Sequence, residues 1–244
     1  MHLALVQLDT VWLDKEANYA KWRALTAHVS PGSLIVLPEM ADVGFTMRSQ
    51  AAGAGDSAAA VVELARQRGC YVAAGIVVRD GSVCRNTCLT AGPDGEIARY
   101  AKRHPFVLVK EGLSYAPGTE VVVADLAGTM LGPSICFDLR HPHVQREAAL
   151  AGAEVLVNVA NWPEARINHW KALLVARAIE NQAYMIGCNR CGRDPYVAYP
   201  GQSVVVDPLG EIVVEAGEEE SVLEAEIDVE RVRQLRRDMP FLRS

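Results

Sequence analysis

The chain has 244 residues, of which half are hydrophobic and 22% charged, with a formal net charge of −6. This length and composition are typical of one compact α/β domain, residues 1–244, and exclude a disordered or fibrous protein. Acidic and basic residues are mixed, with no basic stripe to neutralise phosphates, so we expect no nucleic-acid partner.

The opening residues and the spacing of the cysteines predict a cytoplasmic protein. The opening Met-His-Leu-Ala-Leu has no basic region and no long apolar stretch, so it predicts a strand and not a signal peptide. No apolar run reaches the ~18–20 residues needed to cross a bilayer, and we expect no membrane contact. The six cysteines are irregularly spaced in a large, core-rich chain, which favours free thiols in a reducing compartment.

Apolar periodicity in the first half of the chain predicts strands that alternate with helices. One helix is expected at residues 14–29, and a second within residues 51–69, with Asp56 as its N-cap. Turn signals at Asp80-Gly81 and at residues 92–95 predict two hairpins. The strands expected in this half are residues 3–8, 33–37, 71–78, 82–91 and 96–101.

The second half continues the pattern. Residues 121–135 predict one or two buried strands with a turn at Ala127-Gly128. Helices are expected at residues 144–151, preceded by Pro142 in the first turn, and at residues 167–182, and the mixed charges near residues 228–237 indicate a solvated helix face. Further strands are expected at residues 153–160, 184–189, 202–207 and 222–227. The total is about eleven strands and five helices, and strands that are apolar on both faces require helical layers outside the sheets.

Reactive side chains follow three of the apolar runs. Glu39 comes directly after residues 34–37, and we expect a partly buried carboxylate there that can act as a general base. Lys102 ends another strand, and Cys136 ends the run of residues 121–135 just before a helix, where backbone N–H groups can favour its thiolate. Taken singly, each has an ordinary alternative, namely an exposed loop acid, a basic surface turn and a buried core thiol.

A thiol, a base and a fixed cation together suit attack on an amide carbon. The base takes the thiol proton, the thiolate adds, and the cation holds the oxyanion until water clears the acyl-enzyme. A histidine base is the alternative, but none of the six histidines lies in a recognisable Cys–His protease context. The carboxylate is therefore the preferred base.

These segments resemble the three signatures of the nitrilase (carbon–nitrogen hydrolase) superfamily, in its order of Glu, Lys and Cys. They are Leu-Pro-Glu39-Met, Tyr-Ala-Lys102-Arg-His and Ser-Ile-Cys136-Phe-Asp-Leu-Arg. The resemblance spans nearly the whole chain and implies a four-layer αββα sandwich. It also implies Glu39 as base, Lys102 as oxyanion stabiliser and Cys136 as nucleophile, with Glu111 as a second carboxylate that supports the lysine and positions the substrate.

Within the superfamily the chain is similar to the omega-amidase branch, chiefly through Asn161-Trp162-Pro163, Arg166 and the segment Ala-Arg-Ala-Ile-Glu-Asn at residues 176–181. That likeness implies hydrolysis of 2-oxoglutaramate or 2-oxosuccinamate with release of ammonia. Such substrates carry a carboxylate, and Arg140, about one helical turn after the nucleophile, is our candidate to bind it, a structural salt bridge being the alternative. The expected pocket walls are Phe45, Phe137, Asn161 and Trp162.

The chain departs from the usual family pattern at Pro105, Phe137, His141 and His143, which leaves the exact substrate open. A deaminated-glutathione amidase or an N-carbamoyl amino acid hydrolase would use the same three residues. A metal or redox protein built on Cys188-Asn-Arg-Cys191 is a remote alternative. The resemblance further implies a homodimer, and the chemistry needs neither a cofactor nor a metal.

Overall fold

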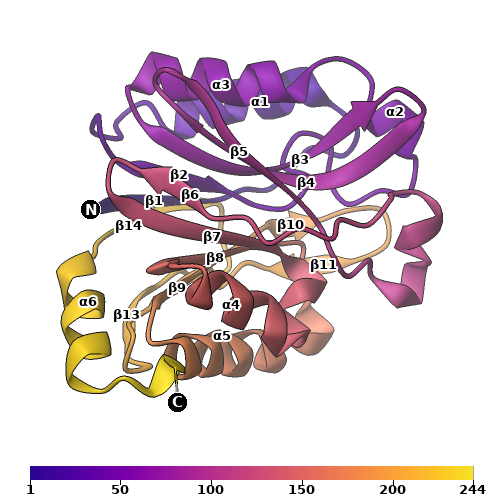
Figure 1. The fold of residues 1–244 in the computed structure, drawn as a ribbon. Coiled ribbons are helices and arrows are strands. Elements are labelled where there is room, and N and C mark those ends of the chain that lie inside the picture. The colour runs from indigo at the N-terminus through magenta and orange to yellow at the C-terminus, as the bar shows by residue number, and fades with distance from the viewer. Residues whose placement is uncertain (244) are drawn as a thin grey trace.

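The computed structural model describes residues 1–243 as two six-stranded sheets packed face to face and covered on both outer sides by helices (Figure 1). The strand order is β14-β1-β2-β3-β4-β5 in the first sheet and β13-β12-β9-β8-β7-β6 in the second. The helices α1 and α3 cover the first sheet, and α4 and α5 cover the second. This arrangement confirms the predicted αββα sandwich.

The first sheet combines parallel and antiparallel strands. Its centre pairs β1, β2 and β3 in parallel, whereas β14 lies antiparallel to β1 and the β3–β4–β5 meander is antiparallel. The strands are β1 (His2–Gln7), β2 (Leu34–Leu37), β3 (Tyr71–Asp80), β4 (Val83–Gly92), β5 (Gly95–Ala101) and β14 (Ser221–Glu226).

The second sheet has a parallel centre of β7, β8 and β9, with antiparallel strands on either side. Its strands are β6 (Ala124–Leu126), β7 (Thr129–Ile135), β8 (Val155–Ala160), β9 (Tyr184–Asn189), β12 (Val204–Val206) and β13 (Ile212–Glu215). The turn between β6 and β7 uses Ala127 and Gly128 at positive φ, as the sequence predicted. A short pair, β10 (Cys191–Arg193) with β11 (Ala198–Pro200), stands apart from both sheets.

Local sequence signals set the helix boundaries. Asp56 caps α3 (Ser57–Arg68) by accepting from the Ala59 amide, and Gly69 ends it in the left-handed conformation. Pro142 occupies the first turn of α4 (Pro142–Leu150), where its missing N–H costs nothing. The other helices are α1 (Lys15–Leu25), α2 (Ser49–Ala52), α5 (Ile167–Asn181) and α6 (Val229–Asp238).

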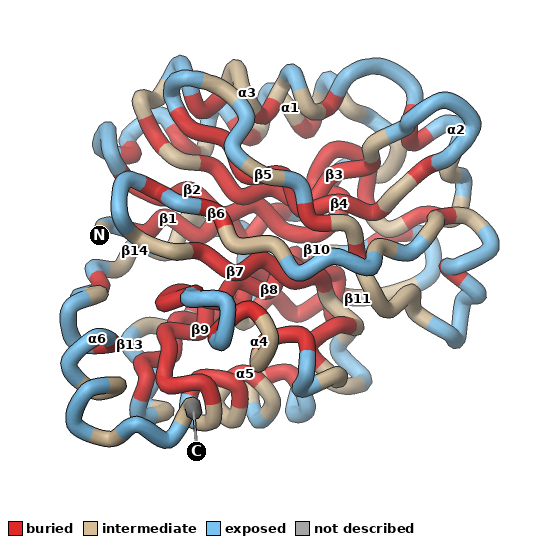
Figure 2. The backbone as a smooth tube through the Cα atoms, viewed as in Figure 1, coloured by how far each residue is buried: buried red, intermediate tan, exposed pale blue. Residues whose placement is uncertain are grey.

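Three apolar layers join the four layers of the sandwich. The central one lies between the sheets and contains Leu5, Val36, Val157 and Ile186, and the other two lie under the helices. The buried segments in Figure 2 run through the middle of the molecule, along the strands. No helix in the described part of the chain is long and apolar enough to span a membrane.

The predicted number of elements was too low. Within residues 1–243 there are fourteen strands and six α-helices, and the predictions missed β10, β11, β13 and the single-turn α2. The β10–β11 pair is three residues long on each strand and carries no apolar run, and β13 is an exposed edge strand whose Ile-Val-Val run is only three residues long.

Candidate active site

Side chains from both sheets meet beyond the ends of four strands. Glu39 follows β2 and Lys102 follows β5 in the first sheet, while Cys136 follows β7 and Asn161 follows β8 in the second. Glu111 starts the short 3₁₀-helix η2 (Glu111–Leu113) in the loop after Lys102. The hydrogen bonds below join Glu39, Lys102, Glu111 and Asn161, and Cys136 lies next to Asn161.

Lys102 is held between two carboxylates. Its Nζ lies 2.7 Å from Glu39 Oε1 and 2.8 Å from Glu111 Oε2, and all three side chains are at most 2% exposed. Burial alone would lower the pKa of Lys102, but the charges of Glu111 and Glu39 outweigh it and hold this pKa well above its usual value. Lys102 is therefore a buried, fixed cation and not part of a surface turn.

Glu39 is fully buried, whereas we expected only partial burial. Its Oε2 accepts from the Asn161 main-chain N–H at 3.0 Å and from Asn161 Nδ2 at 3.1 Å. Asn161 Nδ2 also donates to the Glu39 carbonyl at 2.7 Å. Because these donors compensate for the lost water, the charged carboxylate can be kept in the interior.

Two further residues shape this cluster, and sequence reasoning missed their roles. Asn86, inside β4, donates from Nδ2 to both Glu39 Oε1 (2.7 Å) and Glu111 Oε1 (2.9 Å). Gly75, inside β3, passes so close to Glu39 that a Cβ there would lie 2.4 Å from the Glu39 Cα. A polar residue and a glycine within buried strands were the available signals.

Cys136 occupies a strained turn at the end of β7. Its φ is +45°, which is uncommon for a residue other than glycine, and its Sγ lies 4.0 Å from the Asn161 carbonyl oxygen. Burial and the charge of Glu39 raise the pKa of the thiol well above its usual value, although Lys102 acts in the opposite direction. These surroundings disfavour the thiolate in the resting protein, in contrast to our expectation that backbone N–H groups would favour it.

Asp138 joins the turn of Cys136 to the segment after Lys102. It is fully buried, and it accepts from the Ile135 N–H (3.1 Å), the Tyr100 hydroxyl (2.8 Å) and the His104 N–H (2.9 Å). The His104 ring stacks on His141 with centroids 3.7 Å apart. His143 meets both of these rings edge to face, so His141 and His143, which depart from the usual family pattern, pack against the segment that Asp138 joins to the turn of Cys136.

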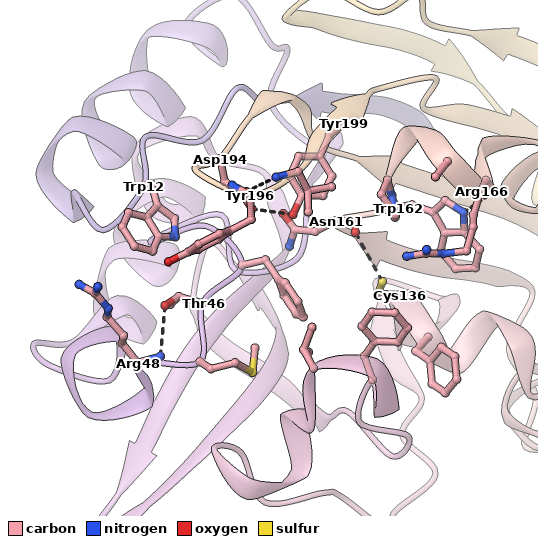
Figure 3. A pocket seen from close by; sticks show the side chains of 18 of the residues that line it. Trp12, Thr46, Arg48, Cys136, Asn161, Trp162, Arg166, Asp194, Tyr196 and Tyr199 are labelled. Carbon is pink, nitrogen blue, oxygen red and sulfur yellow. Dashed lines mark hydrogen bonds between the residues drawn. The ribbon is translucent and has the colours of Figure 1, made fainter.

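A cavity of about 540 Å³ opens above Cys136. All five predicted pocket residues line it, together with several that were not predicted. Figure 3 shows Cys136, Trp162 and Arg166 at one end of the cavity and Trp12, Arg48 and Tyr196 at the other. The predicted lining residues are Phe45, Phe137, Arg140, Asn161 and Trp162.

Arg140 lies over the Trp162 ring, 4.9 Å from its centroid, and its Nη2 is 3.1 Å from His169 Nδ1. Burial and the charge of Arg166 lower the pKa of Arg140. Arg166 lies over the Phe106 ring in the same wall, 5.4 Å from its centroid. Neither guanidinium forms an ion pair with a carboxylate of residues 1–243, so the alternative of a structural salt bridge at Arg140 is not found.

Cys188 and Cys191 are buried core thiols. Cys188 Sγ lies 3.4 Å from the Val36 carbonyl and Cys191 Sγ lies 3.6 Å from the Gln7 carbonyl. Burial raises the pKa of Cys191 to about 12, and it also raises that of Cys188. Among residues 1–243 no three His, Cys, Asp or Glu side chains are grouped so as to hold a metal ion.

Comparisons with known proteins show the family of the chain. Residues 2–237 match the carbon–nitrogen hydrolase family. The chain is 39% identical to the omega-amidase YafV of Yersinia enterocolitica, covering 98% of this chain and 94% of that protein, and 36% identical to the 2-oxoglutaramate amidase of Bacillus subtilis, covering 85% and 82%.

Solved structures give the same result. A carbon–nitrogen hydrolase superfamily protein from Xanthomonas campestris superposes with a TM-score of 0.94 at 33% identity, over 99% of this chain and 96% of that one. The Nit3 protein of Saccharomyces cerevisiae, from branch 10 of the nitrilase superfamily, gives 0.88 at 27% identity, over 98% and 94%. The chain belongs to the carbon–nitrogen hydrolase family, within the nitrilase superfamily.

Proposed function

We propose that this protein is an omega-amidase that hydrolyses the terminal amide of 2-oxoglutaramate or 2-oxosuccinamate and releases ammonia. The observation that carries the proposal is the position of Cys136. It lies beside a buried carboxylate and a buried cation, at the floor of a pocket whose wall holds arginines without carboxylate partners. The omega-amidase and 2-oxoglutaramate amidase similarities support this choice of substrate.

Substrate binding begins at the wall. The substrate carboxylate pairs with Arg140, whose guanidinium is fixed on the Trp162 ring and has no competing carboxylate. Phe45, Phe137 and Trp162 exclude water from the bound chain of the substrate. This contact sets the distance at which the amide carbon meets Cys136 Sγ.

Acylation then uses the floor of the pocket. Glu39 takes the thiol proton, Cys136 Sγ bonds to the amide carbon, and the Lys102 ammonium stabilises the oxyanion that forms. The C–N bond breaks as the nitrogen takes the proton from Glu39, and ammonia leaves. Because burial and Glu39 raise the pKa of the thiol, proton transfer to Glu39 accompanies the attack of Sγ on the amide carbon.

Deacylation reverses the roles. Glu39 accepts a proton from water, the resulting hydroxide attacks the thioester, and the dicarboxylate product leaves with the thiol restored. Glu111 keeps Lys102 charged and oriented throughout, because its Oε2 accepts from Lys102 Nζ and from the Phe106 N–H. Asn161 orients Glu39 through its main-chain and side-chain N–H groups.

The proposal includes a cytoplasmic homodimer whose subunits are each a single domain of residues 1–244. Support for pairing comes from the outer helical layer, where Leu150 of α4 and Ile179 of α5 are half exposed. Light scattering of the purified protein tests the dimer, and Ile179→Glu is expected to yield monomers. A monomer at micromolar concentration in the unmodified protein would contradict this part.

The central test measures ammonia release from 2-oxoglutaramate and 2-oxosuccinamate. The unmodified protein should release ammonia, Cys136→Ala should not, and Cys188→Ala serves as the matched cysteine control. Equal release by the unmodified protein and Cys136→Ala would refute Cys136 as the nucleophile. If no ammonia is released from either amide, the omega-amidase proposal fails.

A further inference from the structure

The cavity extends well beyond what the proposed substrate fills. Its volume of about 540 Å³ lies within the range of roughly 300–1,000 Å³ that encloses drug-sized ligands, whereas an ω-amide of a five-carbon acid is far smaller. The half nearest Cys136 contains Arg140, Trp162 and Arg166, which the proposed substrate occupies. The other half, here called the distal chamber, is lined by Trp12, Met47, Arg48, Tyr196 and Val197.

The distal chamber is joined directly to the catalytic floor. The Phe45 ring lies 5.7 Å from Lys102 Nζ, and the following residues Thr46, Met47 and Arg48 continue along the cavity. Figure 3 shows this segment ending at Arg48, beside Trp12. An amine released from an amide carbon beside Glu39 and Lys102 can therefore pass along residues 45–48 into the distal chamber.

The walls of the distal chamber are held in place. Trp12 packs on Gly44, where a Cβ would lie 3.1 Å from Trp12 Cδ1 and φ is +76°. Asp194 accepts from the main-chain N–H groups of Tyr196 and Val197, both at 2.7 Å, and so fixes the opposite wall. The Trp12 and Tyr196 rings meet edge to face at 6.1 Å, and Tyr196 is 74% exposed, which places it at the rim.

The chamber also offers a cation without a carboxylate partner within residues 1–243. The Arg48 guanidinium lies over the Trp12 ring, 5.1 Å from its centroid, and it pairs with no carboxylate of the described residues. Two aromatic rings and a cation suit a ligand that has an aromatic body and a carboxylate.

Resting on the proposed omega-amidase function, we propose that the distal chamber binds the amine part of N-substituted ω-amides, with an aromatic amino acid as the preferred amine. The ring of the amino acid packs against the surface that the contacting Trp12 and Tyr196 rings form together, and its carboxylate pairs with Arg48. The chemistry is the same acyl transfer: Cys136 Sγ bonds to the carbonyl carbon, the C–N bond breaks, and the amino acid leaves with the proton held by Glu39. Water then hydrolyses the thioester.

The test compares four amides of the distal carboxyl group of 2-oxoglutarate. They are the unsubstituted amide and the amides of phenylalanine, of phenethylamine, which lacks the carboxylate, and of alanine, which lacks the ring. The phenylalanine amide should exceed each of the other two substituted amides about tenfold in kcat/KM, since a charge-assisted pair and an aromatic contact are each of that order. The proposal is overturned unless kcat/KM for the phenylalanine amide exceeds the values for both the phenethylamine amide and the alanine amide.

Two variants assign the preference to residues. Arg48→Gln should lower the ratio of kcat/KM for the phenylalanine amide over the phenethylamine amide about tenfold, and Trp12→Leu should lower the ratio over the alanine amide. Arg79→Gln, an exposed arginine outside the cavity, is the matched control and should leave both ratios unchanged. If neither ratio moves in Arg48→Gln and Trp12→Leu, the chamber does not bind the amine part.

The outcomes separate this proposal from the proposed function. Release of ammonia from the unsubstituted amide without cleavage of the phenylalanine amide refutes the chamber and leaves the omega-amidase function standing. Cleavage of the phenylalanine amide alone supports the chamber and refutes the omega-amidase substrate. If no amide is cleaved, calorimetry decides: the phenylalanine amide should bind Cys136→Ala about tenfold more tightly than Cys136→Ala/Arg48→Gln, and equal affinities overturn the proposal.

Discussion

The charged side chains on the floor of the cavity (Glu39, Lys102 and Glu111) are paired with one another, whereas those on its wall (Arg140 and Arg166) have no charged partner among the described residues. On the floor, every carboxylate oxygen of Glu39 and Glu111 accepts at least one hydrogen bond, and Lys102 bridges the two side chains. On the wall, Arg140 and Arg166 lie on aromatic rings and pair with no carboxylate of residues 1–243. The hydrogen bonds of the floor hold the catalytic side chains in a fixed geometry, whereas the two arginines of the wall can pair with the carboxylate of a ligand.

Removing the cation breaks the floor most severely. Lys102→Met leaves two buried carboxylates without their shared partner, and we expect a loss of about 3–5 kcal/mol in the free energy of unfolding together with loss of amidase activity. Urea unfolding and ammonia release measure the two effects. The double variant Lys102→Met/Glu111→Gln should regain part of the stability and none of the activity. A Lys102→Met variant as stable as the unmodified protein would contradict the buried ion cluster.

A substitution at Gly75 should disturb the floor less than the loss of Lys102, because it acts by moving the main chain. Gly75→Ala would place a Cβ 2.4 Å from the Glu39 Cα and 2.5 Å from the Pro38 carbonyl, so β3 and the segment of Glu39 must separate. We expect a destabilisation of about 1–3 kcal/mol and a marked fall in kcat. Gly217→Ala is the control, because a Cβ there meets nothing within 4 Å. Equal thermal unfolding midpoints for the two variants would refute the close approach.

The floor also controls the thiol. Because burial and Glu39 raise the pKa of Cys136, the folded protein holds this proton more tightly than the unfolded chain does. Thiolate absorbance of the native protein minus that of Cys136→Ala should therefore stay low through neutral pH and rise only well above pH 9. The same thiol should titrate near its ordinary pKa of about 8.5 in denaturant. A titration at or below pH 8 in the native protein would contradict this prediction.

Sequence reasoning found the site residues that follow strands, and it missed those whose roles depend on the close approach of two segments. Glu39, Lys102 and Cys136 each follow a strand, and the resemblance to the three signatures of the nitrilase superfamily selected them; Glu39 and Lys102 form an ion pair in the structure. Gly75 and Asn86 lie within β3 and β4, and their roles depend on the distance to the segment of Glu39, which no periodicity encodes. The raised pKa of the thiol was missed for the same reason, since burial and a neighbouring carboxylate are properties of the assembled fold.

The same limit applies to the elements. The periodicities of α3 and α5 predicted both helices, since each buries one apolar stripe. The β10–β11 pair, which carries Asp194 and Tyr196 in its connection, has no such pattern and was missed. That omission removed one wall of the cavity from the sequence-based picture of the site, so the predicted substrate pocket was smaller than the observed one.

The smallest expected effect on folding sharpens the contrast between wall and floor. Arg166 pairs with no carboxylate of residues 1–243, so Arg166→Gln should change the free energy of unfolding by no more than about 0.5 kcal/mol, unlike the buried lysine. Its charge nevertheless lies close enough to Arg140 to lower the pKa of that residue, and both side chains line the same cavity. We expect kcat/KM for 2-oxoglutaramate to fall about tenfold in Arg166→Gln, mainly through KM, because the lost contact binds ground state and transition state alike.

Arg79→Gln is again the control, and Arg166→Lys should recover part of the loss because it keeps the charge. A fall in kcat with unchanged KM would assign Arg166 to the reaction itself and remove the distinction between wall and floor.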